Sequence, residues 1–195
     1  MTDNLYAPPK TITAIDAGQD NAQTFYVVSP RKLAILFWGT FGNYVLYLFY
    51  KNWALQKQAT GADIMPVMRG LFSIFFVLDL YQLADKRLTE KGETHPWDIH
   101  SLATKYIVLV IGKNVLERIT ISQPFPQLLA LGMLYGVYRT LAQAQNGLNL
   151  AAGDAEGTSN HKLTAANYVW IVLGVALWVI VILGLLSMVW PGLLK

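Results

Sequence analysis

The sequence contains no cysteine. That absence excludes disulfide bonds, thiolate catalysis and cysteine-ligated metal sites. Charged residues are also scarce: they form 14% of the 195 residues, whereas soluble domains carry about 25%. Hydrophobic residues form 54% of the chain. This balance indicates a membrane protein, because a chain with so little charge and so much apolar surface is suited to lipid.

Sequence motifs for catalysis are missing as well. The chain has no GxSxG, GxGxxG, P-loop or HExxH pattern. Residues 92–100 hold four side chains of the metal-ligating type: Glu93, His95, Asp98 and His100. Imidazole and carboxylate groups suit divalent metals, but this spacing matches no established zinc motif. We therefore expect a non-catalytic protein without a cofactor or a bound metal.

The charge that is present is mildly basic. The formal net charge is +3 and the pI is about 9.0. With so few charges in total, Lys and Arg are expected to flank membrane segments and to face anionic head groups. The lipid bilayer, and not nucleic acid, is therefore the expected partner of these cations.

Long apolar segments are the main feature of the chain. Five are predicted, at residues 33–50, 64–83, 102–119, 124–141 and 166–191. The last contains no charged residue and is long enough to cross a hydrocarbon core, which takes about 20 residues. Segment 102–119 carries several charges, so it is either a membrane helix with a polar face or a helix along the interface. The predicted fold is an all-α, multi-pass integral membrane protein with four to five membrane helices.

The first segment lies in the stretch GTFGNYVLYLFYKNW, residues 39–53. Gly39 and Gly42 interrupt it, which a membrane helix tolerates. A re-entrant hairpin that turns at residues 40–43 is the alternative to a continuous span. The choice decides the side of the membrane on which Lys51 lies.

Charge placement predicts the topology. Residues 1–28 are polar and lack a signal-peptide pattern, so we expect a disordered cytoplasmic tail before a helical transmembrane domain at 29–195. With five spans, most Lys and Arg residues lie inside, as the positive-inside rule requires. Lys51 and Lys57 fall outside in that arrangement, and a re-entrant first segment returns both to the cytoplasm. The expected location is a membrane, with the N-terminus in the cytoplasm.

One short motif recurs in the chain, and a weak internal repeat is the less favoured of its two explanations. The motif YxxYK at Tyr47, Tyr50 and Lys51 is matched 88 residues later by YxxYR, which ends at Arg139. A Gln- and Ala-containing stretch, a Gly/Asp turn and another apolar segment follow each motif. The matched positions are few enough that coincidence is the alternative to an ancient duplication.

Six aromatic residues are placed where helices would meet the membrane surface: Tyr44, Tyr47, Tyr50, Trp53, Trp170 and Trp190. Tyr and Trp gather at that level, and Lys51 can extend its ammonium group there. The functional alternative for the aromatic residues of 39–53 is a cation-binding cage or a contact stripe for a partner helix.

Four charged residues are candidates for an intramembrane polar site: Arg69, Asp79, Lys113 and Glu117. A charge at the centre of a bilayer costs about 2.5–3.5 kcal/mol on insertion scales and therefore indicates a site. Lys113 and Glu117 are four residues apart, which makes them neighbours on a helix. The alternatives are pairing between helices, contact with head groups, or the solvated face of an interfacial helix.

Several stretches of the chain form a recognisable set: FYVVSPRKL followed by GTFGNYVLYLFYKNW, then GADIMPVMR, NHKLTAANYVWIVLG near the C-terminus, and the N-terminal YAPP. Through these stretches the chain resembles a group of uncharacterised bacterial inner-membrane proteins. Asn43 and Leu48 depart from the pattern of that group, where an apolar residue and Trp are expected. The resemblance implies a multi-pass inner-membrane protein and no particular activity.

These features predict a protein that binds another membrane protein, as an accessory subunit or as an immunity protein against a membrane-targeted toxin. Glycine-interrupted, aromatic helices that pack closely support this prediction. The alternative is a small oligomeric transporter or channel, in which Arg69, Asp79, Lys113 and Glu117 line a polar path.

Overall fold

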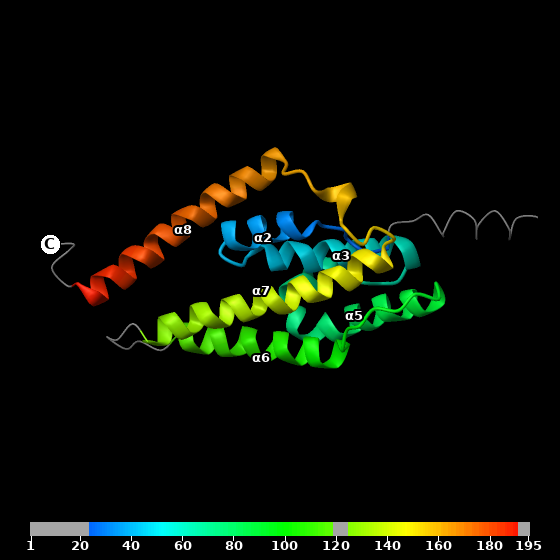
Figure 1. The fold of residues 1–195 in the computed structure, drawn as a ribbon, viewed down its shortest axis with the longest axis horizontal. Coiled ribbons are helices and arrows are strands. Elements are labelled where there is room, and N and C mark those ends of the chain that lie inside the picture. The colour runs from blue at the N-terminus through cyan, green and yellow to red at the C-terminus, as the bar shows by residue number, and fades with distance from the viewer. Residues whose placement is uncertain (1–23, 119–124, 191–195) are drawn as a thin grey trace, which may run out of the picture.

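The computed structural model describes residues 24–118 and 125–190, and the predicted tail at 1–23 lies outside that part. The described residues form helices and no strand, which confirms the all-α prediction. The elements, shown in Figure 1, are α2 (Pro30–Gly39), α3 (Tyr44–Thr60), α4 (Pro66–Leu71), α5 (Ser73–Glu90), α6 (Ile99–Glu117), α7 (Phe125–Ala151), the 3-10 helix η1 (Thr158–Asn160) and α8 (Ala165–Val189).

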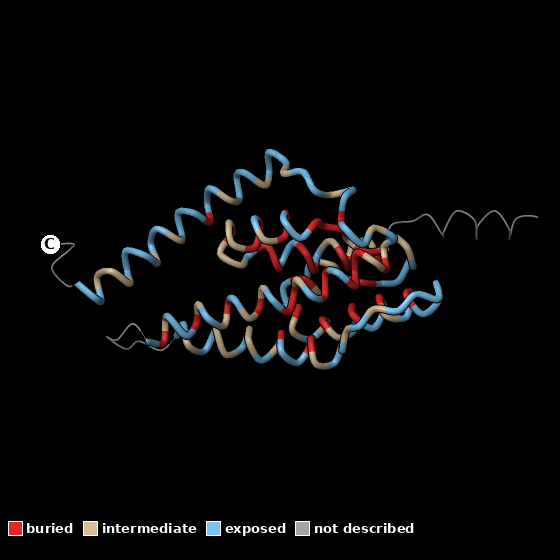
Figure 2. The backbone as a smooth tube through the Cα atoms, in the orientation of Figure 1, coloured by how far each residue is buried: buried red, intermediate tan, exposed pale blue. Residues whose placement is uncertain are grey.

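The helices form a bundle from which α8 diverges. Helices α6 and α7 lie side by side as a long antiparallel pair, and α2, α3 and α5 pack at one end of it (Figure 1). Buried residues gather where these elements meet, whereas α8 is exposed along almost its whole length (Figure 2). The largest fully buried side chains include Trp53, Tyr81 and Tyr106, from three different helices. One aromatic-rich core therefore holds the bundle together.

The first predicted segment, 33–50, is not a continuous helix. Helix α2 ends at Gly39, and α3 begins at Tyr44 after Phe41 and Gly42 adopt positive φ angles of 54° and 80°. Two successive residues of that conformation cannot continue a right-handed helix. The Thr40 hydroxyl donates to the Leu36 carbonyl (2.7 Å) and accepts from the Tyr44 N–H (2.9 Å), so it joins the two helices. The prediction of a continuous helix over 33–50 is therefore wrong, and the chain turns at 40–43, where the alternative placed the turn.

The second predicted segment, 64–83, is also divided. Helix α4 ends at Leu71, Phe72 departs from helical geometry with φ −101° and ψ 38°, and α5 then continues to Glu90. A Cβ at Gly70 would lie 3.1 Å from the Leu46 carbonyl oxygen and the Tyr50 nitrogen. Helix α4 therefore contacts the backbone of α3 directly, and the chain must bend at Phe72 to leave that contact.

Two of the described helices are long and apolar enough to cross a membrane, by length and composition: α6 and α8. They match the predicted segments 102–119 and 166–191. The number is smaller than the four to five predicted, because 33–50 and 64–83 are each broken. Segment 124–141 is the first part of α7, whose second half contains Gln145, Asn146 and Asn149.

An extended segment before α2, the strap (residues 24–29), runs between α3 and α7. Phe25, Val27 and Val28 are buried, so residues 24–28 are part of the core. The prediction of a disordered tail up to residue 28 is wrong for these residues. The reason is that their backbone, which has no neighbouring strand, finds hydrogen-bonding partners among side-chain amides.

Amides on α7 bind one side of the strap. Asn149 accepts from the Val28 N–H (3.1 Å) and donates to the Val28 carbonyl (3.0 Å), as a neighbouring strand would. Gln145, one turn earlier, donates to the Tyr26 carbonyl (2.9 Å) and to the Asn149 side-chain oxygen (2.8 Å). Since buried backbone groups need partners, these two amides make the extended conformation tolerable in the core.

Amides on α3 bind the other side. Asn52 accepts from the Tyr26 N–H (2.9 Å), and Gln56 donates to the Thr24 carbonyl (2.7 Å). Each helix thus contributes two amides four residues apart, which places both on one face. The strap also fixes the level of α3: Lys51 lies with its ammonium group 5.9 Å from the Tyr26 ring centre. The hairpin therefore returns Lys51 to the end of the bundle where the chain enters α2.

Candidate functional site

A cleft of about 680 Å³, here called the basic cleft, opens beside the α2–α3 turn. The turn, the α4–α5 break, α6 and α7 all contribute to its walls. Its apolar wall includes Phe41, Leu46, Phe72 and Val110, and its cations are Lys113 and Arg118. Small-molecule sites usually occupy about 300–1,000 Å³, are mostly apolar and contain a few fixed polar groups. The volume of the cleft lies in that range, and its lining combines apolar side chains with Lys113, Arg118 and other polar groups.

Two local breaks in the chain create the cleft. Because α2 and α3 fold back at Phe41–Gly42, the turn between them ends beside Leu134 of α7 and neither helix continues further along the α6–α7 pair. Because the chain bends at Phe72, α5 likewise starts only at Ser73. There the Ser73 and Tyr106 hydroxyls form a buried hydrogen bond of 2.7 Å that joins α5 to α6. This pair is a polar group in an otherwise apolar part of the lining.

The cations of the cleft lie on the last turns of α6. The Lys113 ammonium group contacts the Glu117 carboxylate at 2.8 Å, as their spacing predicts. Arg118 is exposed, and among the described residues no carboxylate lines the cleft. The side-chain amide of Asn114 donates to the Val110 carbonyl (2.7 Å), so its side-chain oxygen can accept from another group. The cleft therefore presents a positive edge to an anion.

The four predicted intramembrane residues do not come together. Of these, Lys113 lines the basic cleft and Glu117 is its partner. Asp79 is exposed on α5, and within the described residues no ion pair joins it to Arg69. A single polar path through all four residues is thus not the arrangement that the structure has.

Arg69 lies in an aromatic cage instead. Its guanidinium group is 4.2 Å from the Trp53 ring centre and 4.8 Å from that of Phe76. Cation–π contacts stabilise by about 0.5–2 kcal/mol, more when water is excluded. One aromatic residue of the stretch 39–53, Trp53, therefore does bind a cation, but the cation belongs to the same chain and the second ring comes from α5. The sequence carried a signal, because Trp53 and Arg69 flank the Gly61 turn between α3 and α4.

The six predicted interface aromatics divide into two groups. Tyr47, Tyr50, Trp170 and Trp190 are exposed, so they are available to a membrane surface. Tyr44 and Trp53 are 6% and 1% exposed, and an interfacial position for them is wrong. The physical reason is that α3 packs against α2, α4 and α5, so only one of its faces is free.

Residues 92–100 have a packing role. The Trp97 ring lies against Gly147, where an added Cβ would be 2.6 Å from it, and its indole N–H donates to Asp85 (2.9 Å). Burial lowers the pKa of the His95 imidazole. Among the described residues no group of three or more His, Asp or Glu side chains is placed to hold a metal ion.

Lys32 is a buried cation that sequence reasoning missed. Its side chain is nearly inaccessible, and its ammonium group donates to the Asn160 side chain and to the Lys162 carbonyl, both at 2.7 Å. These bonds fix the loop before α8 to the start of α2. Ser29 caps α2, but nothing in the local pattern predicted burial of Lys32.

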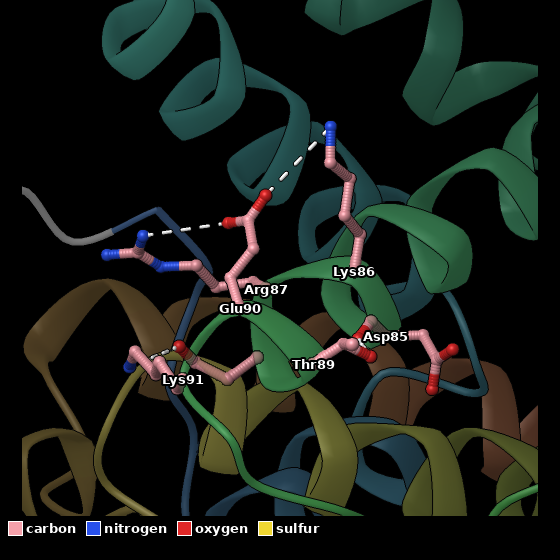
Figure 3. A network of polar contacts seen from close by, with 7 residues as sticks. Asp85, Lys86, Arg87, Thr89, Glu90 and Lys91 are labelled. Atoms are coloured by element: carbon pink, nitrogen blue, oxygen red, sulfur yellow. Dashed lines mark hydrogen bonds and ion pairs between the residues drawn. The ribbon is translucent and has the colours of Figure 1, made fainter.

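Charged residues gather at the end of the bundle where α5 ends and α6 begins. Figure 3 shows part of this group: Glu90 contacts Lys86 and Arg87, both at 3.9 Å, and Lys91 donates to the Ala151 carbonyl (3.0 Å). Because the α2–α3 hairpin folds back, Lys51 lies toward this charged end as well.

Comparisons with protein-family models, with curated proteins and with solved structures found no match to this chain. The resemblance to bacterial inner-membrane proteins remains a prediction. The proposal for the function therefore rests on the fold, the basic cleft and the exposed surface of α8.

Proposed function

We propose that the chain is a non-catalytic multi-pass protein of the bacterial inner membrane that binds another membrane protein through α8, as an accessory subunit or a toxin-immunity protein. The observation that carries this proposal is α8 itself. It is apolar on every face and almost fully exposed. A helix of that kind is stable either inside a protein core or in lipid.

The attachment of α8 leaves most of its surface free. It contacts the rest of the chain where Gly174 meets the Gly39 backbone and where the Trp178 indole donates to the Trp38 carbonyl (2.7 Å). Further along, a Cβ at Gly184 would have no neighbour within 4 Å. Small residues allow close approach between membrane helices, so this part of α8 suits a partner helix.

The distribution of charge supports a cytoplasmic location for the charged end. The folded α2–α3 hairpin removes the difficulty with Lys51, which a continuous first span would have placed outside. Positive-inside placement then agrees with an N-terminus in the cytoplasm. In this arrangement α6 and α8 cross the bilayer, α7 returns, and the α2–α3 and α4–α5 pairs enter it without crossing.

The second candidate, a transporter or channel, has less support. Its proposed path needed Arg69, Asp79, Lys113 and Glu117 on one surface. Arg69 instead makes cation–π contacts with Trp53 and Phe76, and Asp79 is exposed on α5.

A photo-reactive amino acid in place of Leu183, on the free part of α8, tests the proposal in living cells. We expect a cross-link to one defined membrane protein, and none from the same probe at Ile171, which packs on Gly39. Membrane extraction at alkaline pH and cysteine labelling at residue 58 check insertion and sidedness. A chain that alkaline washing releases from membranes, or α8 cross-links to lipid alone, would refute the proposal. If the partner is a toxin, expression of the chain rescues cells from it.

A further inference from the structure

We propose that the basic cleft holds one anionic phospholipid of the leaflet opposite the charged end, with its phosphate at Lys113 and Arg118 and an acyl chain along the apolar wall. This inference rests on the proposed membrane location. It adds a specific ligand that the proposed partner protein does not supply.

The length of α6 places Lys113 and Arg118 at the head-group layer opposite the charged end. The helix has 19 residues and starts at the charged end, so at about 1.5 Å per residue it is about 28 Å long. The hydrocarbon core of a bilayer is about 30 Å thick. A helix that starts at one head-group layer therefore brings Arg118 to the opposite one. Lys113, just over a turn earlier, extends its ammonium group toward the same layer.

The length of the cleft matches the depth of one leaflet. Its lining extends along α6 from Tyr106, near the middle of the helix, to Arg118 at the end. Twelve residues of helix correspond to about 18 Å, which is close to the depth of one leaflet. The wall between these levels is apolar and includes Leu46, Phe72 and Val110. The apolar wall, which can hold an acyl chain, therefore lies toward the bilayer centre, and the cations that can bind a head group lie toward its surface.

Charge complementarity selects the head group. Glu117 offsets Lys113, but Arg118 has no carboxylate partner among the described residues, and no carboxylate lines the cleft. Basic pockets between membrane helices on the cytoplasmic side bind anionic lipid head groups, and the same charge pairing is available to a cleft at the opposite leaflet. A zwitterionic lipid brings its own cation to the same place, so its net attraction is weaker. A phosphate that bridges Lys113 and Arg118 is the geometry we infer.

Native mass spectrometry of the full chain in detergent tests the inference, with phosphatidylglycerol and phosphatidylcholine as probes. We expect one phosphatidylglycerol to bind at least about fivefold more tightly than phosphatidylcholine, since each cation near an anionic head group contributes about fivefold. The double variant Lys113→Ala/Arg118→Ala should lose that preference. The matched control Lys105→Ala/Arg139→Ala removes two exposed cations from the same helix pair outside the cleft, and should keep it.

A second measurement keeps the test decisive if the double variant does not fold. Phosphatidylglycerol with a photo-reactive acyl chain should label the wild-type chain near Phe72 and Val110, and unlabelled phosphatidylglycerol should compete. Val110→Trp should fill the cleft and abolish this labelling. Equal binding of both lipids, equal losses in the two double variants, labelling spread evenly over α8, or a dimer that covers the cleft would each overturn the inference. Because the assay uses detergent, it separates failure of the lipid site from failure of α8 to bind a protein partner.

Discussion

Asn149→Ala removes the side chain that most directly substitutes for a neighbouring strand. Asn149 is fully buried and takes part in three hydrogen bonds, of which two go to the backbone of Val28, itself fully buried. An alanine leaves the N–H and the carbonyl of Val28 without partners. Each buried unsatisfied group costs about 1–3 kcal/mol. The expected loss of unfolding free energy is therefore about 2–6 kcal/mol, a large part of the 5–15 kcal/mol that is typical of a whole domain.

The free energy of unfolding is measured by equilibrium denaturation in detergent. Limited proteolysis then reports how readily the strap is cleaved. Detachment of the strap should expose Tyr26 and speed cleavage in residues 24–29. Asn146→Ala is the matched control, because Asn146 is an exposed amide on the same helix. Exposed substitutions usually change stability by no more than about 0.5 kcal/mol. If both variants lose equally little unfolding free energy, the Asn149 amide does not hold the strap, and the reasoning is refuted.

Three other predictions concern the contacts that place α8 and α3. Gly174→Ala should weaken the attachment of α8 to α2 and lower the thermal midpoint, because its Cβ would collide with the Gly39 carbonyl; Gly184→Ala, with free space around it, should leave the midpoint unchanged or raise it. Arg69→Met should cost about 0.5–2 kcal/mol in chemical denaturation through loss of the cation–π contacts, and Lys at that position should recover part of it. Hydrogen bonds from Ser159 and, secondarily, from Thr158 hold the pKa of the Asp154 carboxyl well below its ordinary value of 3.8. Its stabilising contribution is therefore complete at neutral pH and is lost as the pH falls below that ordinary value. Asp154→Ala should lower the thermal midpoint at neutral pH, and the difference from wild type should shrink in strong acid.

Local sequence patterns predicted individual helices well where one signal dominated. The start of α8 follows Thr164, whose side chain forms a capping box with Asn167, and its uninterrupted apolar run continues to Val189. Pro66 and Pro30 occupy first-turn positions of α4 and α2, as their fixed φ angle favours. Elsewhere the same rules failed, because hydropathy does not register a bend. Gly70 lies two residues before Phe72, but a single glycine in an apolar segment did not predict that the helix breaks there.

The candidate site was only partly predictable. Lys113 and Glu117 are neighbours on one helix, so spacing alone predicted their contact. Arg69 and Asp79 share an apolar segment, and a continuous helix was expected to keep both in one membrane span. The break at Phe72 separates them, and Arg69 meets Trp53 from another helix. Arg118 joined the site only through the fold, since its significance depends on the cleft beside it.

By itself the sequence determined the helical class, the apolar character of α6 and α8, and a turn near residues 40–43 as one of two outcomes. These are properties of short windows, in which hydropathy, capping and glycine act locally. Only the tertiary structure decided that Tyr44 and Trp53 are buried, that the strap is held by amides from two helices, and that two breaks leave a cleft beside α6. Such features depend on contacts between residues distant in sequence, as between Val28 and Asn149. No local pattern records those contacts, because the free energy that fixes them arises only when the segments meet.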